Sequence, residues 1–347
     1  MECIDVMGIG FGCVDLVYLD EVKDYAEPVL MNGGTCLNVL TVLAQLGANV
    51  KMIMAGTKAD AIYKQFLKNC NKLNVNILFM NNSNNSLPRC IQINSNNSHK
   101  YQQVCPFCNN RLKYATWGRS AKDVEEISGE PEASVLFIDR ITMGIKKVIQ
   151  QYYNRRKIIF FEPNSSRNIS SIVGVSFFCD IVKFSSSKIS KKKADQIVES
   201  SLNGNLKLVI VTKGRDGLDF KYRNTTNDSF SEWIEVKPNN IIKGGDSSGS
   251  GDWLTAGFIN RFILMNGKTA IYSVDNIKKA LDYAMGLSEI ANLSIGAQGP
   301  FYDQKLIQQL RESYHIRLDK HLEKSSFKAD SVLTGFCPLC GQILHKK

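Results

Sequence analysis

The strongest pattern in this chain of 347 residues is KGGDSSGSGDWLTAGFINRFI, residues 243–263. Its glycine-rich turn, Gly249-Ser250-Gly251, leads into apolar residues at helical spacing and places Asp252 in the first turn of the predicted helix. A helix N-terminus offers unpaired amide groups to an anion, and a carboxylate beside them could take a proton from a substrate hydroxyl. The same pattern occurs where an acidic residue merely caps a helix, so the residues alone leave both interpretations open. The chain has no GxxxxGK(S/T) sequence, which excludes a P-loop.

Short apolar runs alternate with helical patterns through most of the chain. The expected strands are residues 3–10, 50–56, 133–139, 157–163, 178–185 and 206–214, and the expected helices include 35–46 and 59–72. This alternation predicts an α/β fold with a mainly parallel central sheet flanked by helices on both faces. In such sheets ligands bind at the carboxyl ends of the strands.

Two segments interrupt the alternation. Residues 15–32 are extended and mixed in polarity, and residues 77–104 contain two alternating strands around a turn at 94–98. They predict a small β-sheet lid, drawn from about 15–32 and 77–115, although a pair of surface hairpins fits the spacing equally well. The lid would belong to a domain spanning residues 1–312.

Composition and charge narrow the function classes. Lys and Arg number 43 against 33 Asp and Glu, and a net charge of +10 favours anionic ligands such as nucleotides, without excluding nucleic acid or a membrane surface. No run approaches the roughly 18 apolar residues needed to cross a bilayer. The start, MECIDVMGIGFG, has the pattern of a strand rather than of a signal peptide. We therefore expect a cytoplasmic protein without a membrane association.

Two Cys-Pro-x-Cys units stand far apart in the chain. VCPFCNNR contains Cys105 and Cys108, and FCPLCGQ contains Cys337 and Cys340. Four thiolates form a closed tetrahedral zinc site of the structural type, so the units predict one shared Zn2+ site. Residues 313–347 would then be a connector and zinc-knuckle tail that packs back on Cys105 and Cys108. A single such unit could instead be incidental or redox-active.

The segment DSSGSGD, residues 246–252, closely resembles the signature of the ribokinase-like (PfkB) carbohydrate kinase family. Further landmarks follow in the family's order: GCVD (12–15), MNGGTCLNVLTVLAQLG (31–47), FEPNSSR (161–167), VTKGRDG (211–217) and AMGLSEIANLSIGAQG (284–299). The resemblance covers roughly residues 3–312. It implies a kinase that uses ATP and Mg2+ to phosphorylate a hydroxyl of a sugar, a sugar derivative or a nucleoside.

The resemblance also implies a role for individual residues. The catalytic set consists of the base and the anion hole for the γ-phosphate: Asp252, Gly249, Ser250 and Gly251. The substrate-binding set is Asp15, Gly33, Gly34, Asn38 and Asn164. The cofactor-binding set is Lys213, Gly214, Gly217 and Asp246. The two asparagines could instead cap helices or turns, and the two adjacent glycines could form an ordinary turn.

One landmark of the family is changed in this chain. Many members carry an N-x-x-E motif whose Glu helps to organise magnesium, whereas Ser185, Ser187 and Lys188 supply no acid here. The alternative function is therefore a catalytically weak regulatory or binding protein. Nucleic-acid binding through the knuckles is disfavoured, because no stripe of aromatic and basic residues accompanies them. Members of the family often dimerise through the lid, so a homodimer is a further expectation.

Overall fold

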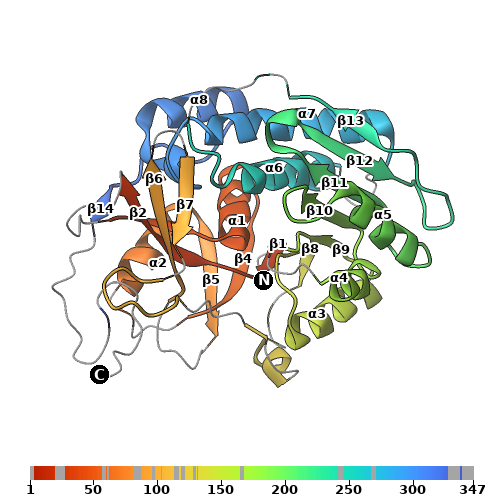
Figure 1. The fold of residues 1–347 in the computed structure, drawn as a ribbon, viewed down its shortest axis with the longest axis horizontal. Coiled ribbons are helices and arrows are strands. Elements are labelled where there is room, and N and C mark those ends of the chain that lie inside the picture. Colours follow the sequence, from red (N-terminus) through yellow and green to blue (C-terminus); the bar gives the residue numbers. More distant parts are fainter. Residues whose placement is uncertain are drawn as a thin grey trace.

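The computed structural model describes most of the chain. Its described residues are 4–19, 28–56, 60, 62–80, 87–95, 98–102, 104–112, 117–118, 122–127, 130, 132–164, 168–238, 240, 245–266, 271–326 and 337. They form a large sheet covered by helices on both faces, with a smaller sheet beside it (Figure 1). The predicted α/β fold class, with a mainly parallel central sheet and a second small sheet, is confirmed.

The large sheet has nine strands among the described residues, in the order β13-β12-β11-β10-β9-β8-β1-β4-β5. All neighbours from β5 to β11 are parallel, and β12 and β13 are antiparallel. The bounds are β1 Ile4–Ile9, β4 Val50–Ala55, β5 Val75–Met80, β8 Ala133–Ile138, β9 Ile158–Phe161, β10 Ile181–Ser185, β11 Leu208–Thr212, β12 Leu218–Tyr222 and β13 Ile234–Val236. The strands are almost continuously apolar because both faces are buried.

Helices cover the two faces of this sheet in separate groups. Their bounds are α1 Thr35–Gln45, α2 Tyr63–Lys72, α3 Met143–Asn154, α4 Ile169–Ser176, α5 Lys191–Ser200, α6 Ser250–Phe258, α7 Val274–Ala291 and α8 Gln304–Tyr314. Val6 of β1 packs in one core with the apolar residues of α1, α2, α6, α7 and α8, and its neighbour Met7 packs in a second core with those of α3, α4 and α5. Alternating side chains of each strand thus feed two cores, one on each face. No helix in the described part of the chain is both long enough and apolar enough to cross a membrane.

The small sheet, which we call the lid sheet, has five strands among the described residues. They are β2 Cys13–Leu19, β3 Val29–Gly33, β6 Arg89–Ser95, β7 Ser98–Gln102 and β14 Ser325–Ser326, in the order β14-β3-β2-β6-β7. In Figure 1 it lies beside the N-terminal half of the large sheet. The predicted lid began at about residue 77, inside the strand β5. Residues 75–80 are the edge strand of the large sheet, where their apolar run pairs in parallel with β4.

The C-terminal tail, residues 315–347, is described at 315–326 and at 337. The predicted domain boundary between 312 and 313 lies in the last turn of α8, which ends at Tyr314. Ile316, Leu318 and Leu322 are buried in the same core as α1 and α2, and β14 pairs with β3. The first part of the tail is therefore part of the main domain rather than a connector.

A buried ion pair joins the lid sheet to the segment before α2. The guanidinium of Arg89, the first residue of β6, donates to both carboxylate oxygens of Asp60 at 2.8 Å, and both side chains are at most 3% exposed. The Asp60 carboxylate also accepts from the amides of Ile62 at 3.0 Å and Leu87 at 2.8 Å. Four donors thus compensate the desolvation of one buried carboxylate.

Removal of the Arg89 side chain should therefore lower the free energy of unfolding by about 3–5 kcal/mol, because it leaves the Asp60 charge buried and unpaired. Urea unfolding of Arg89→Ala measures this effect. The matched control is Glu323→Gln, which breaks the solvent-exposed pair between Lys68 and Glu323 and should change the free energy by less than about 1 kcal/mol. Equal effects of the two substitutions would contradict this account of the lid's attachment.

Candidate active site

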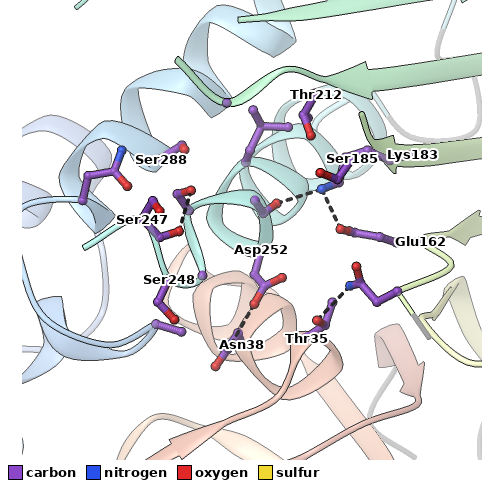
Figure 2. A pocket seen from close by; sticks show the side chains of 18 of the residues that line it. Thr35, Asn38, Glu162, Lys183, Ser185, Thr212, Ser247, Ser248, Asp252 and Ser288 are labelled. Atoms are coloured by element: carbon purple, nitrogen blue, oxygen red, sulfur yellow. Dashed lines mark hydrogen bonds and ion pairs between the residues drawn. The ribbon is translucent and has the colours of Figure 1, made fainter. Parts of the chain in front are cut away.

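A cavity of about 830 Å3 lies between the carboxyl edge of the large sheet, the lid sheet and the start of α6. Residues that follow β1, β9, β10 and β11 line it from the large sheet, and Asp15, Cys90 and Tyr101 line it from the lid sheet. Figure 2 shows Asp252 near the centre of the lining residues. The cavity occupies the place at which parallel α/β sheets bind ligands.

The first turn of α6 faces this cavity. Gly249, which precedes the helix, has the left-handed φ of 78°, and a Cβ there would lie 2.3 Å from the Cβ of Ala297, so the position requires glycine. No side chain caps α6, and Gly249, Ser250 and Gly251 all line the cavity. Beyond the helix itself, one described atom lies within 4 Å of the position that a Cβ of Gly251 would take. This atom is the ammonium nitrogen of Lys183, at 3.5 Å. The uncapped turn is thus open on the side where an anion could bind.

Asp252 is buried in the first turn of α6, as predicted, and its carboxylate accepts a hydrogen bond from Asn38 Nδ2 at 2.7 Å. Asn38 lies on α1, so this bond joins the two helices that meet at the cavity. Burial, assisted by the nearby Glu162 carboxylate, raises the pKa of Asp252 from 3.8 to about 7. The hydrogen bond from Asn38 and the Lys183 ammonium oppose this rise. Asp252 is therefore a carboxylate that can exchange a proton near neutral pH.

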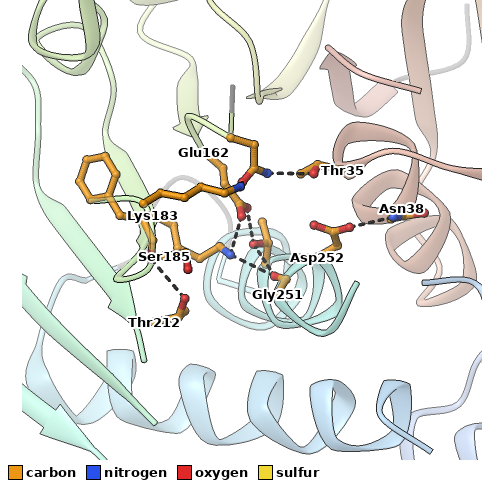
Figure 3. A network of polar contacts seen from close by, with 12 residues as sticks. Thr35, Asn38, Glu162, Lys183, Ser185, Thr212, Gly251 and Asp252 are labelled. Carbon is orange, nitrogen blue, oxygen red and sulfur yellow. Dashed lines mark hydrogen bonds and ion pairs between the residues drawn. The ribbon is translucent and has the colours of Figure 1, made fainter. Parts of the chain in front are cut away.

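A second buried network holds α6 against the sheet (Figure 3). Lys183 of β10 donates to Glu162 Oε1 at 2.7 Å and to the Gly251 carbonyl at 3.1 Å, and Thr255 Oγ1 of α6 donates to Glu162 Oε2 at 2.8 Å. The sequence prediction did not include Lys183. Its signal was a lysine in the middle of the apolar run FCDIVKFS, where a strand buried on both faces has no solvent for a cation.

Asp15 provides a second buried carboxylate, on the lid side of the cavity. It accepts a hydrogen bond from Cys13 Sγ at 3.2 Å, and burial raises its pKa to about 7. A Cβ at Gly33 would lie 1.9 Å from Asp15 Oδ2, so the glycine makes room for the carboxyl group although it does not itself line the cavity. Gly34, at φ 93°, does line it and starts α1.

The wall opposite the lid carries polar and basic groups. Asn164, which follows β9, donates to Thr35 Oγ1 at 2.8 Å and accepts from Lys188 Nζ at 2.7 Å. Arg140 lies over the Phe11 ring, 4.7 Å from its centroid. All five side chains line the cavity. Arg140 and Lys188 therefore add positive charge beside the space between Asp15 and Asp252.

The predicted cofactor-binding residues divide into two groups. Gly214 and Gly217 line the cavity. Lys213 instead pairs with Asp219 at 2.9 Å and Glu235 at 2.8 Å, and does not line the cavity.

Asp246 also lies behind the cavity lining. Its carboxylate accepts from Gln92 Nε2 at 2.8 Å and from the amides of Ser248 and Gly296, each at 2.9 Å. It shapes the loop before α6 and joins that loop to the lid sheet. The landmark at residues 284–299 also contributes to the cavity, through Ser288 and Glu289 of α7 and Asn292 just after it, although the sequence prediction assigned no role to these three residues individually.

The donor set fits a resident magnesium ion poorly. Each described carboxylate that lines the cavity already has a partner: Glu162 bonds to Lys183 and Thr255, Asp252 to Asn38, Asp15 to Cys13, and Glu289 to Asn240. Lys188 occupies the place of the acid that the family motif would supply. A Mg2+ ion here would have to be held mainly by the phosphates of a bound nucleotide and by water, as Mg2+ often is.

Several solved structures share the fold of this chain. An uncharacterised sugar kinase from Pyrococcus horikoshii, in complex with ATP, matches with a TM-score of 0.63 and 19% identity over 84% of this chain and 93% of that one. The chain has the ribokinase-like fold. A putative ribokinase II from E. coli, in complex with ATP and Mg2+, matches with a TM-score of 0.64 and 15% identity over 88% of this chain and 99% of that one.

A fructokinase with bound ATP from Xylella fastidiosa matches this ribokinase-like chain with a TM-score of 0.65 and 14% identity, over 84% of this chain and 93% of that one. No protein-family model matches the chain. At these sequence identities the comparisons establish a shared fold and do not identify a substrate.

The raised pKa of Asp252 carries a cost in stability. An unfolded Asp loses its proton near pH 4, whereas folded Asp252 keeps it until about pH 7, so stability falls as the pH rises through this window. Asp252→Asn cannot ionise and should be more stable than the natural protein at about pH 8, by on the order of a few kcal/mol. The difference should vanish below about pH 4.

Urea unfolding at several pH values measures this difference, with Asp282→Asn on the exposed side of α7 as the control. The control should show no such pH-dependent gain. An Asp252→Asn variant that is less stable than the natural protein at alkaline pH would contradict the assignment of a buried, costly carboxylate.

Proposed function

We propose that this protein is a member of the ribokinase-like (PfkB) family and transfers the γ-phosphoryl group of ATP to a hydroxyl of a sugar, a sugar derivative or a nucleoside. One observation carries the proposal: a carboxylate with a pKa of about 7 lies in the first turn of an uncapped helix that faces the cavity. This places a proton acceptor beside an anion site. Phosphoryl transfer requires mainly this kind of positioning and charge stabilisation.

In the proposed reaction the oxygen of the acceptor hydroxyl forms a bond to the γ-phosphorus of ATP, and Asp252 accepts the proton of that hydroxyl. The bond between that phosphorus and the bridging oxygen of ADP breaks, and ADP leaves with the electron pair. The first-turn amides around Gly249, Ser250 and Gly251 would stabilise the charge on the transferring group. Lys183 would act by positioning, because it ties the Gly251 carbonyl to Glu162.

The acceptor would bind between the lid sheet and α1. Asp15 can accept hydrogen bonds from sugar hydroxyls, Asn38 and Asn164 offer amide groups, and Gly34 lets the backbone approach. The nucleotide would extend along Gly214 and Gly217 toward α7. Arg140 and Lys188 would attract an anionic substrate, so sugar acids and sugar phosphates belong in the substrate panel.

Three cofactor and compartment assignments accompany the proposal. ATP would enter as its Mg2+ complex, and we assign Zn2+ to the cysteine cluster described below. Among the described residues, Cys13, Cys36, Cys70, Cys90 and Cys179 form no disulfide, which favours a reducing compartment such as the cytoplasm. A homodimer through the lid sheet remains a prediction.

The alternative is a ribokinase-like protein that binds nucleotide or sugar and turns over little. The observation that favours it is Lys188, which stands where an acid would help to hold magnesium. Activity assays separate the two functions, because a binding protein retains nucleotide affinity without phosphoryl transfer.

The decisive assay is ATP consumption with Mg2+ across ketoses, aldoses, sugar acids, sugar phosphates and nucleosides. One substrate class should be phosphorylated, and Asp252→Ala should lower kcat by about 100-fold to 10,000-fold, as expected for loss of a general base. Asp282→Asn should leave the rate unchanged. A phosphorylated product formed equally well by Asp252→Ala would refute the role of Asp252, and ATP binding without any turnover would favour the alternative.

The pH dependence of kcat/KM provides a second test. The base must be deprotonated, so kcat/KM should rise with pH and level off above about pH 7. In Asn38→Ala the carboxylate loses a hydrogen bond that favours its charged form, and the rise should move to higher pH by roughly one unit. Because Asp15 also has a pKa of about 7, the same profile is measured in Asp15→Asn. A profile that Asn38→Ala leaves in place would show that another group controls the rate.

A further inference from the structure

Three cysteine side chains from distant parts of the chain converge at the end of the lid sheet. The sulfur atoms of Cys105, Cys108 and Cys337 all lie within 4.8 Å of one another. Cys105 is fully buried, and Cys337 is 1% exposed. The cluster lies outside the cavity that holds Asp252, so the proposed kinase reaction does not account for it.

The separation of the sulfur atoms distinguishes a metal site from a disulfide. Cys105 Sγ and Cys337 Sγ are 3.8 Å apart, far beyond the roughly 2.05 Å of a disulfide bond. Two thiolates on a tetrahedral Zn2+, each about 2.3 Å from the metal, are about 3.8 Å apart. Neutral thiols can also pack as small hydrophobic groups. Packing alone, however, gives no reason for three sulfur atoms to converge on one point.

The backbone around Cys105 has the form of a tight turn that presents two sulfurs together. The Cys105 amide donates to the Asn110 carbonyl at 2.9 Å, and the Asn109 amide donates to the Cys105 carbonyl at 2.9 Å. Asn109 takes a left-handed φ of 57°. Cys337 comes from the second Cys-Pro-x-Cys unit, and its partner Cys340, the predicted fourth ligand, lies outside the described residues.

We propose that this cluster binds one Zn2+ and that the metal fastens the C-terminal tail to the lid sheet, so that metal binding controls the order of β7 where it contacts the loop before α6. The cluster follows directly on β7, which ends at Gln102. Within β7, the Tyr101 hydroxyl is 2.6 Å from Ser248 Oγ in the loop before α6. The effect on catalysis rests on the proposed function, whereas metal binding and the order of β7 do not.

The tail gives the metal a fixed anchor on the opposite edge of the lid sheet. There β14 pairs with β3, the Leu322 amide donates to the Phe301 carbonyl at 2.7 Å, and Lys72 Nζ donates to the His321 carbonyl at 2.9 Å. Since β14 and β7 are the two edges of the lid sheet, the tail is attached at one edge and the metal would attach it at the other. Without the metal, the tail would lose this second point of attachment to the lid sheet.

Metal analysis of the purified full-length protein tests the site. We expect about one zinc per chain, lost in Cys105→Ser and in Cys337→Ser, and lost or much weakened in Cys340→Ser. The control is Cys179→Ala, a buried thiol away from the cluster, which should keep its zinc. Should the serine variants fail to fold, release of zinc from the natural protein by a thiol-directed mercurial, followed by a chelator, supplies the zinc-free form. A protein that contains no zinc and takes up none when Zn2+ is added would overturn the site.

Hydrogen exchange in the zinc-loaded and zinc-free forms tests the coupling without any substrate. Loss of zinc should increase exchange at least several-fold in residues 98–112 and leave β8 and α5 unchanged. Zinc loss with unchanged exchange in β7 would overturn the coupling while leaving the metal site intact. If an acceptor is known, zinc loss and Tyr101→Phe should raise its KM, and their effects should not add, because both act through the contact with Ser248. Additive effects on KM would show that zinc does not act through the contact between Tyr101 and Ser248.

Discussion

The buried contact between Lys183, Glu162 and the first turn of α6 is the interaction on which the candidate site depends. One ammonium group joins the strand β10, the carboxylate that follows β9 and the Gly251 carbonyl. Removing one partner from such a buried pair typically costs about 3–5 kcal/mol, so the alignment of α6 on the sheet is strongly fixed. The direction of the first turn and the burial of Asp252 both follow from this alignment.

The burial of carboxyl groups at this site lowers the stability of the folded protein. Asp15 and Asp252 are both buried, and both have a pKa of about 7, so each carboxylate is disfavoured when it is charged. A sequence selected for stability alone would place neutral groups there. Their presence in the lining of one cavity is a physical reason to regard the cavity as functional, because strongly shifted carboxyl groups gather where proton transfer is needed.

Much of this structure could be predicted from the sequence because its signals are local. The apolar runs identified β1, β4, β8, β9, β10 and β11, and the glycine-rich turn identified the start of α6. The structure departs from the expected bounds where tertiary contacts decide: residues 75–80 pair with the large sheet, and tail residues after α8 pack in the main core. The bonding partners of Lys183 and Asp246 could not be predicted from the sequence, because those partners lie far away in the chain. Three of the four predicted zinc ligands converge, although Cys337 follows Cys108 by 229 positions in the sequence.

The lid sheet connects these features. Arg89 joins it to the segment before α2, Gln92 and Tyr101 join it to the loop before α6, and the tail pairs with its β3 edge. The central claim, that the first turn of α6 binds the transferring phosphate beside Asp252, is tested most directly by a crystal structure with a non-hydrolysable ATP analogue and Mg2+. We predict that the γ-phosphate lies against the amides of Gly249 to Gly251, with the Asp252 carboxylate facing it across the space for the acceptor hydroxyl. A triphosphate bound elsewhere, or one that leaves this turn empty, would contradict the account.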